Sequence, residues 1–190
     1  MLYNNTILRD MNIGFDFDGI FIDAPPLVPR IVIEKLYRKK TNGRLLYRIP
    51  SKFEQKIRLL AHHPFLRPPI TENIAFLKEL TENNSHKHYL ISSRFSFLRQ
   101  KTEELTKKYG IDKLFNNMYF NYVDKQPHIF KNQIIKQIGI HRYVDDDIYL
   151  LNFLSLKNPK TIFFWLNKNK KGKLKKNLFA ISHLSQMFAS

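Results

Sequence analysis

Short apolar runs alternate with amphipathic stretches along this chain. The apolar runs predict β-strands near residues 12–17, 88–92, 118–122, 142–145 and 161–165, because strands of globular proteins have about this length. Between them, apolar residues at helical spacing predict helices near residues 71–82, 95–109, 128–138 and 147–156. Such alternation is typical of an α/β fold with a doubly wound parallel sheet. A last amphipathic stretch, residues 174–187, predicts a helix that packs on this sheet.

The segment between the first two predicted strands interrupts the alternation. It carries two helical patterns, near residues 28–40 and 51–62, and is bracketed by Pro25-Pro26 and Pro68-Pro69. Paired prolines restrict the backbone and are suited to stiff hinges. We therefore expect a core domain formed by residues 1–24 and 68–190, and a small helical insert formed by residues 25–67.

Positive charge is in large excess. The 190 residues include 32 Lys and Arg against 16 Asp and Glu, which gives a formal net charge of +16. Basic patches beside aromatic residues are typical of nucleic-acid binding, and Phe163, Phe164 and Trp165 precede a run of lysines at positions 168, 170, 171, 173, 175 and 176. Lys, Asn, Ile and Phe are abundant throughout, as in proteins of AT-rich genomes, so a compositional origin stays open. We expect weak, salt-sensitive binding of nucleic acid by this basic tail.

The chain contains no cysteine, which excludes disulfides, thiol nucleophiles and Cys-ligated zinc. His62 and His63, next to Pro64, are interpreted as a surface pair rather than as metal ligands. No basic segment followed by a long apolar run opens the sequence, and no stretch approaches the roughly 20 apolar residues of a membrane span. We expect a cytoplasmic protein without membrane contact, whose oligomeric state the sequence does not indicate.

Two carboxylates, Asp16 and Asp18, end the first predicted strand and are followed at once by Gly19. The strand period of two places them on one face, and glycine lets the chain turn away. Ligands of open α/β sheets bind beyond the carboxyl ends of the strands. An EF-hand is excluded, because the twelfth loop position counted from Asp16 is Leu27 rather than Glu. A solvated acidic loop remains the alternative.

Three later segments follow in order. Ser92-Ser93-Arg94 ends the second strand, Lys131 lies in the first turns of a helix, and Asp145-Asp146-Asp147 ends a further strand. Each also has a purely structural interpretation: Ser92 as a helix cap and the acidic triplet as a helix N-terminus.

Taken together, the ordered set resembles the four motifs of the haloacid dehalogenase superfamily of phosphohydrolases, over roughly residues 12–165. Asp16 and Asp18 match the first motif, Ser92 the second, Lys131 the third, and Asp145-Asp146 the fourth. Lys125, in Asp124-Lys125-Gln126-Pro127, is an alternative for the third motif; we prefer Lys131 because it lies 14 positions before the paired aspartates, as in nucleotidase-like phosphatases of the family. The resemblance implies a three-layer Rossmann-like fold in which the insert is a helical cap.

The resemblance also implies a role for each residue. Asp16 would be the nucleophile that forms an aspartyl phosphate, and Asp18 the general acid and base. Ser92, Lys131, Ser93 and Arg94 would bind the phosphoryl group and the substrate. Mg²⁺ would be held by Asp16, Asp146 and the backbone carbonyl of Asp18, with Asp145 as the substitute if the register is off by one.

The function expected from this resemblance is that of a Mg²⁺-dependent phosphomonoesterase, acting on a small phosphorylated metabolite or nucleotide. Two alternatives stay open. One is a phosphatase that acts on nucleic-acid ends, and the other is a basic nucleic-acid-binding protein that keeps the fold without catalysis.

Overall fold

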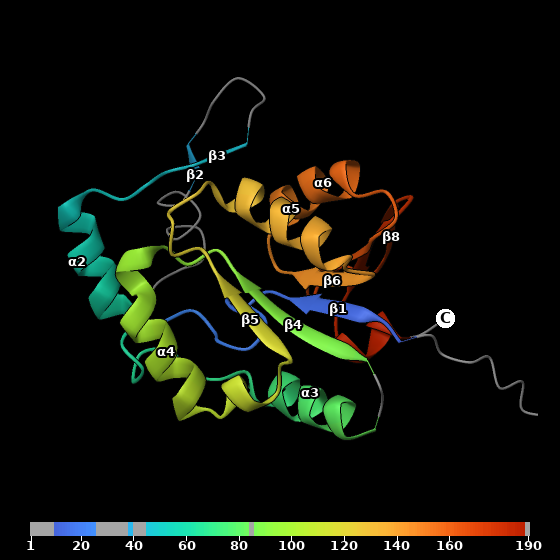
Figure 1. Cartoon of the computed structure of the whole chain (residues 1–190), viewed down its shortest axis with the longest axis horizontal. Helices are drawn as coiled ribbons and strands as arrows, with labels where there is room; N and C mark the ends of the chain where they lie inside the picture. Colours follow the sequence, from blue (N-terminus) through green and yellow to red (C-terminus); the bar gives the residue numbers. More distant parts are fainter. Residues whose placement is uncertain (1–9, 26–37, 40–44, 84–85, 189–190) are drawn as a thin grey trace, which may run out of the picture.

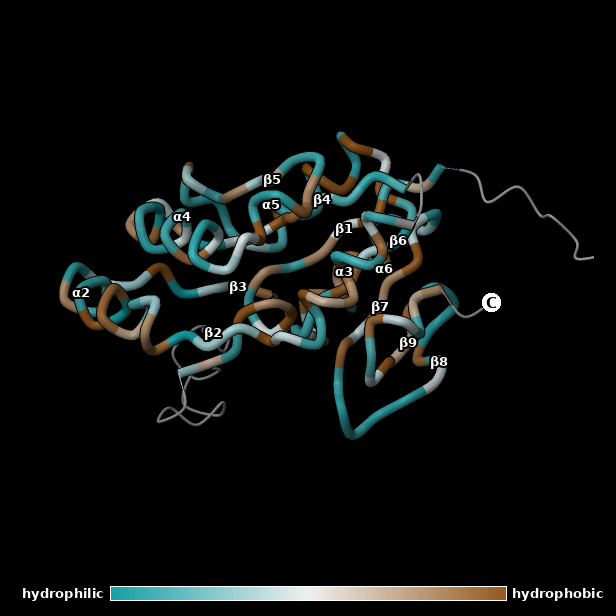
Figure 2. Tube along the Cα trace, turned by 90° about the horizontal axis from the view of Figure 1, so that it is seen from below, coloured by the Kyte–Doolittle hydropathy of each residue, from teal (hydrophilic) through white to brown (hydrophobic). Residues whose placement is uncertain are grey.

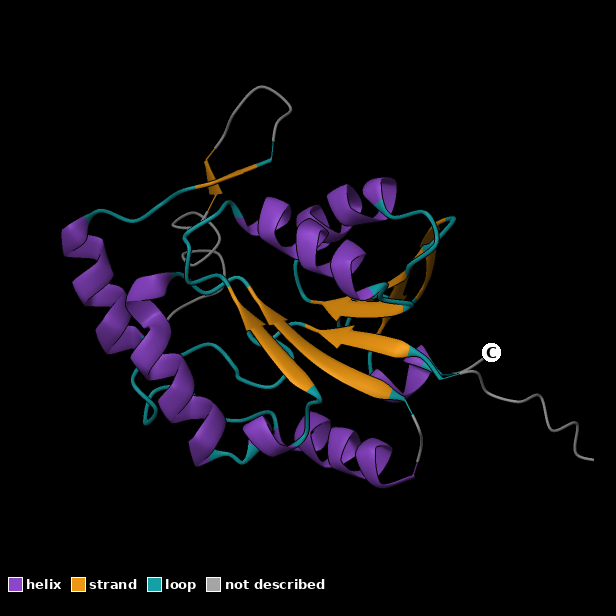
Figure 3. Cartoon of the chain, in the orientation of Figure 1, coloured by secondary structure: helices purple, strands orange, loops and turns teal. Residues whose placement is uncertain are grey.

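A seven-stranded sheet with helices on both faces forms the body of the molecule (Figures 1 and 3). The computed structural model describes residues 10–25, 38–39, 45–83 and 86–188. The strands lie in the order β5-β4-β1-β6-β7-β9-β8, and all neighbours are parallel except β8 and β9. Their bounds are β1 Asn12–Phe15, β4 Lys87–Ser92, β5 Asn117–Phe120, β6 Arg142–Asp145, β7 Ile162–Leu166, β8 Gly172–Lys175 and β9 Leu178–Ile181. The five predicted strands and the α/β class are thus confirmed.

The predicted helices of the core are also confirmed. They are α3 Thr71–Asn83, α4 Arg99–Lys108, α5 Pro127–Ile138 and α6 Ile148–Lys157, and a 3₁₀ turn over Ser96–Leu98 precedes α4. In Figure 1, α5 and α6 lie above the sheet, and α3 lies below it. None of the described helices is long and apolar enough to span a membrane.

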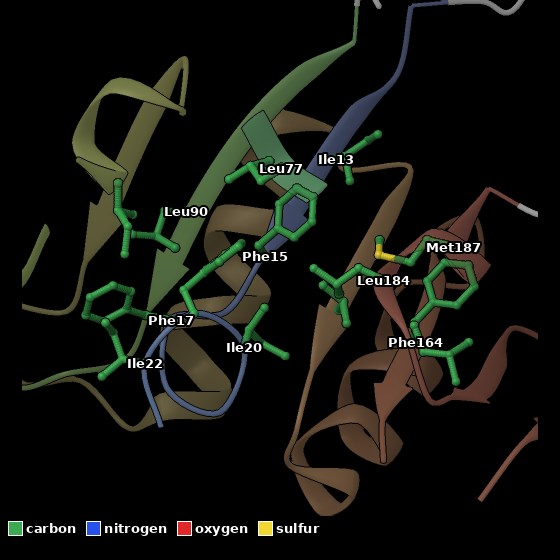
Figure 4. Close-up of a cluster of buried hydrophobic side chains, with 14 of the residues drawn as sticks. Ile13, Phe15, Phe17, Ile20, Ile22, Leu77, Leu90, Phe164, Leu184 and Met187 are labelled. Atoms are coloured by element: carbon green, nitrogen blue, oxygen red, sulfur yellow. The ribbon is translucent and has the colours of Figure 1, made fainter. Parts of the chain in front are cut away.

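Successive side chains of the central strands belong to two separate apolar cores on opposite faces of the sheet. Ile13 and Phe15 of β1 belong to the core that includes Leu77 of α3 (Figure 4). Tyr143 of β6 points to the opposite core, which α5 and α6 cover with residues such as Ile135. This is the period of two expected for strands that are buried on both faces. A side chain one residue beyond Phe15 therefore points toward the side of α5.

The prediction of a C-terminal helix over residues 174–187 is wrong. The chain forms a β-hairpin, β8 and β9, with a turn at Lys176-Asn177, followed by a 3₁₀ turn over Leu184–Met187. The Asn177 side chain donates hydrogen bonds to the carbonyls of Ser155, Asn158 and Thr161 (3.0–3.2 Å), so contacts far away in sequence override the helical spacing. All four residues of β8 are exposed at the sheet edge, and the segment that leads into β8 is hydrophilic (teal in Figure 2). Lysines at such an edge discourage pairing with another chain.

The described part of the insert contains one helix, α2 Lys52–Ala61, and a two-stranded sheet of β2 Arg38–Lys39 and β3 Leu46–Tyr47. Helix α2 matches the prediction of 51–62, and Ser51 and Glu54 cap its N-terminus reciprocally. Most of the predicted helix 28–40 lies outside the described residues, and its last two residues belong to β2 instead. Tyr47 ties β3 to the core, because its hydroxyl donates to Asp147 (2.8 Å) and its N–H to Gln126 (2.9 Å).

Candidate active site

The acidic residues singled out in the sequence meet at the carboxyl ends of neighbouring strands. Strand β1 lies between β4 and β6, so Asp16, which follows β1, lies beside Asp145 at the end of β6. A cavity of about 230 Å³ opens there and is lined by both the core and the insert. Its walls include Asp16, Asp18, Arg94, Lys131 and Asp146 from the core, and Tyr47, Arg58, His62 and Arg67 from the insert.

Lys131 joins the two strand ends. Its Nζ donates to Asp16 Oδ1 and to Asp145 Oδ2, each at 2.7 Å, and only 1% of the lysine is exposed. Asp145 also accepts hydrogen bonds from the Tyr143 hydroxyl (3.0 Å) and from the backbone N–H of Asp147 (2.9 Å). Both oxygens of Asp145 are therefore engaged by donors of the protein.

Lys131, the residue preferred for the third motif, lies at the acidic cluster. Helix α5 begins at Pro127, and its residues Phe130 and Ile134 pack on the sheet. This packing places Lys131 at the carboxyl ends of the strands. Lys125, the alternative, extends to Gln133 Oε1 (2.9 Å) in an exposed position. The geometry brings Lys131 to the acidic cluster and leaves Lys125 outside it.

Burial and charge act in opposite directions on this cluster. Burial alone would lower the pKa of Lys131, but the Asp145 and Asp16 carboxylates outweigh it and raise that pKa well above its ordinary value. Burial raises the pKa of Asp16 well above its ordinary value, against the pull of Lys131, and the charges of Asp145 and Asp18 add to the rise. Any further positive charge in the cavity would therefore stabilise the ionised form of Asp16.

Asp18 is held by two guanidinium groups. Arg94 donates from Nε to Oδ2 (2.8 Å) and from Nη2 to Oδ1 (2.7 Å), and Arg67 of the insert donates to the same Oδ1. Burial would raise the pKa of Asp18, but Arg94 and Arg67 outweigh it and hold that pKa far below its usual range. In this arrangement Asp18 is an ionised carboxylate and a weak base. Arg94 also stacks on Phe17, 4.6 Å from the ring centroid.

Sequence reasoning missed the contribution of the insert. Arg58, His62 and Arg67 are buried and line the cavity, so the interpretation of His62 as a surface residue is wrong. Burial and the charges of Arg94 and Arg67 lower the pKa of His62 to about 3, so its imidazole is neutral near pH 7. Its Nδ1 lies 2.7 Å from the Arg58 carbonyl, one helical turn earlier. The helical spacing of positions 58 and 62 is the signal that marks one inward face of α2.

The donor set suits a divalent cation. Carboxylate oxygens of Asp16, Asp145 and Asp146 all lie within 4.8 Å of one another, and such hard oxygen ligands are those that Mg²⁺ prefers. Each of the three offers one oxygen to such a cation, and both oxygens of Asp145 also accept hydrogen bonds from protein donors. The backbone at Asp146 is fixed by Trp165, whose Nε1 donates to its carbonyl (3.0 Å).

Ser92 and Ser93 differ in their placement. Ser92 ends β4 and is buried, and its Oγ accepts a hydrogen bond from the backbone N–H of Arg94 (3.4 Å). Among the described residues Ser93, rather than Ser92, lines the cavity. A phosphate contact by Ser92 stays a prediction.

The absence of a side chain at Gly19 leaves room for the Asp146 carboxylate. Its φ is +75°, and a Cβ built there would overlap that carboxylate. We expect Gly19→Ala to lower activity at least about tenfold, because a displaced ligand or charge in a site is worth several kcal/mol. Gly139→Ala is the matched control: its φ is +67°, but nothing lies within 4 Å, so both variants carry the same backbone strain of about 1–2 kcal/mol. Equal activities of the two variants would contradict this role for Gly19.

Comparison with known proteins identifies the fold. No protein family model and no curated protein matches the sequence. An aspartate-to-alanine mutant of a haloacid dehalogenase family enzyme from Bacteroides thetaiotaomicron, in complex with magnesium and inorganic phosphate, is similar with a TM-score of 0.54 and 15% identity, over 85% of this chain and 96% of that chain. A haloacid dehalogenase-like hydrolase from Xanthomonas campestris has a TM-score of 0.54 and 11% identity, over 92% and 91%.

A third similar structure is the Pnkp1/Rnl/Hen1 RNA repair complex. One of its chains has a TM-score of 0.52 and 16% identity, over 83% of this chain and 42% of that chain. The mostly parallel sheet flanked by helices is consistent with these comparisons. The fold of this chain is that of the haloacid dehalogenase-like hydrolases.

Proposed function

We propose that this protein is a Mg²⁺-dependent phosphomonoesterase. The observation that carries the proposal is the position of Lys131, which joins Asp16 and Asp145 at the floor of a cavity that Asp146 also lines. A cation site and a carboxylate nucleophile are the parts that phosphoryl transfer through an aspartyl phosphate requires.

Asp16 has the first role in the reaction. One of its carboxylate oxygens bonds to phosphorus while the bond between phosphorus and the leaving oxygen breaks, which leaves a phosphoryl group on Asp16 and an alcohol as the first product. Water then attacks the same phosphorus and releases inorganic phosphate and the free carboxylate. Lys131 holds Asp16 in place through both steps and neutralises charge beside it.

Mg²⁺ would be held by Asp16 and Asp146, with the backbone carbonyl of Asp18 as a further candidate. When bound, Mg²⁺ neutralises charge on the phosphoryl oxygens. The added positive charge also favours the ionised form of Asp16 that the attack needs.

Asp18 completes the proton transfers. It would donate a proton to the leaving oxygen in the first step and accept one from the attacking water in the second. Because Arg94 and Arg67 hold the pKa of Asp18 far below its usual range, this role requires that both guanidinium groups leave Asp18 for the substrate phosphate. Arg94 and Arg67 are suited to hold substrate phosphate, because guanidinium groups bind such oxygens in pairs. Since Arg67 comes from the insert and Arg94 from the core, both parts of the chain would contact the bound phosphate.

The proposed activity has two candidate substrate classes. The pattern of motifs favours a small phosphorylated metabolite or nucleotide. The similarity to a chain of an RNA repair complex supports a phosphorylated nucleic-acid end as the second candidate.

Release of inorganic phosphate from a panel of phosphomonoesters tests the proposal. We expect turnover of at least one compound, its loss after Mg²⁺ is removed with EDTA, and its return when Mg²⁺ is added back. The panel includes nucleoside monophosphates, sugar phosphates and oligonucleotides phosphorylated at either end. Phosphate release that is equally fast without Mg²⁺ would refute the metal site.

A further inference from the structure

The insert presents an aromatic ring almost entirely to solvent. Phe65 follows α2 and is 85% exposed, the largest exposed fraction among the large apolar side chains of the described residues. Its ring stacks on the imidazole of His63, with centroids 5.4 Å apart and planes 18° apart. The Lys108 ammonium lies 4.7 Å from the ring centroid. We refer to Phe65, His63 and Lys108 as the Phe65 platform.

The backbone around this platform is anchored on the end of α4. The Pro64 carbonyl accepts hydrogen bonds from Lys108 Nζ (3.1 Å) and from the Tyr109 hydroxyl (3.2 Å). The Arg67 carbonyl lies 3.1 Å from the same hydroxyl, whose single proton is shared between the two carbonyls. These bonds fix the chain on both sides of Phe65, so the exposed ring is pre-organised. A rigid aromatic face binds a planar partner at little cost in conformational entropy.

The platform lies close to the cavity along the chain. His62 and Arg67, which line the cavity, are three residues before and two residues after Phe65. Since an extended chain covers about 3.3–3.6 Å per residue, the Cα of Phe65 lies at most about 11 Å from that of His62 and about 7 Å from that of Arg67. The terminal phosphate and the first few nucleotides of a single-stranded nucleic acid span such a distance.

We propose that the Phe65 platform stacks a base of a single-stranded nucleic acid whose phosphorylated end lies in the cavity. Every base has a face that stacks on an aromatic ring, and Lys108 supplies a cation for the adjoining backbone phosphate. The net charge of +16 attracts a polyanion over the whole surface. The inference rests on the proposed function for the position of the phosphorylated end, and it selects the nucleic-acid substrate over the small metabolite.

Equilibrium binding tests this inference without turnover. Fluorescence anisotropy of single-stranded oligonucleotides phosphorylated at the 3′ or the 5′ end is measured with the full chain, in the presence of Mg²⁺ and in an Asp16→Asn background that prevents hydrolysis. Stacking is worth about 1–3 kcal/mol per base, so we expect Phe65→Ala to weaken binding by roughly 5- to 150-fold. Phe65→Tyr should stay within about twofold. Phe53→Ala is the matched control, because Phe53 is a second exposed aromatic residue of the insert, on α2.

The salt dependence of oligonucleotide affinity distinguishes the contribution of base stacking from that of charge. Phe65→Ala is expected to keep the slope of log affinity against log salt, whereas Lys108→Ala should reduce the slope by about 0.7, the contribution of one phosphate contact on a single strand. The strand with a phosphorylated end should bind more tightly than the same strand with a hydroxyl end.

The outcomes distinguish this inference from the proposed function. If the wild-type protein releases no phosphate but Phe65→Ala weakens oligonucleotide binding, the result supports the Phe65 platform and refutes the proposed phosphatase activity. An active phosphatase whose oligonucleotide affinity is the same in wild type, Phe65→Ala and Phe53→Ala refutes the platform. So does a change in sedimentation of Phe65→Ala without a change in affinity, since that result assigns the ring to contact between copies of the chain.

Discussion

Asp16→Asn is expected to lower kcat/KM for phosphomonoester hydrolysis by at least about 10⁴-fold, the size of loss seen when a catalytic nucleophile is removed. An amide has neither the charge nor the nucleophilic oxygen that the attack on phosphorus needs. The fold should stay intact, because the amide oxygen still accepts a hydrogen bond from Lys131, and Lys131 retains Asp145. Steady-state phosphate release measures the effect.

Asp23→Asn is the control for this substitution. Asp23 is an exposed carboxylate in the loop after Gly19 and is not among the residues that line the cavity. Its variant should keep wild-type activity, and circular dichroism and thermal unfolding should show that both variants are folded. A folded Asp16→Asn protein with near wild-type turnover would rule out Asp16 as the nucleophile.

Lys131→Met is expected to have the largest effect on stability. The substitution keeps the length of the side chain but leaves the Asp16 and Asp145 carboxylates buried side by side without their cation. Breaking a buried ion pair in this way costs about 3–5 kcal/mol of the free energy of unfolding. The midpoint and the slope of urea unfolding measure it, and activity at a temperature where the variant is folded should fall at least about tenfold.

Lys125→Met is the matched control. Lys125 lies on an exposed loop and contacts Gln133, so its loss should change the free energy of unfolding by no more than about 0.5 kcal/mol. The reverse ranking, with Lys125→Met damaging activity and Lys131→Met neutral, would move the third motif to Lys125.

Much of the core and of the acidic site could be predicted because the evidence is local. The strand period of two places Asp16 on the side of α5 once Phe15 is assigned to the opposite core. That inference needs only the regular geometry of strands and helices. The preference for Lys131 over Lys125 comes instead from the resemblance, since Lys131 lies 14 positions before Asp145, as in nucleotidase-like phosphatases of the family.

The insert could not be read in the same way, because its role depends on contacts between distant segments. Arg67 lies 49 residues from Asp18 in sequence, and nothing in the residues around it indicates an ion pair with that carboxylate. His63 and Pro64, the neighbours of His62, predict a surface position, but the burial of His62 depends on how α2 packs on the core.

The C-terminal error has the same physical origin. Leu174, Leu178 and Ile181 have the spacing of a helix face, yet Asn177 bonds to carbonyls 16 to 22 residues away and closes a hairpin. Tertiary contacts of this kind override local periodicity. The lysines around this hairpin also have a structural reason to be there, since they border an edge strand. Nucleic-acid binding by this basic tail stays a prediction.

Trapping the phosphoryl group on the protein is the most direct test of the central claim that Asp16 attacks phosphorus. A reaction with a turned-over phosphomonoester is quenched in acid during the first turnover, digested and examined by mass spectrometry. The mechanism predicts one added phosphoryl group on the peptide that contains Asp16, in the wild type and not in Asp16→Asn. An active enzyme that shows no phosphoryl group there, or that carries it on another residue, would contradict the mechanism.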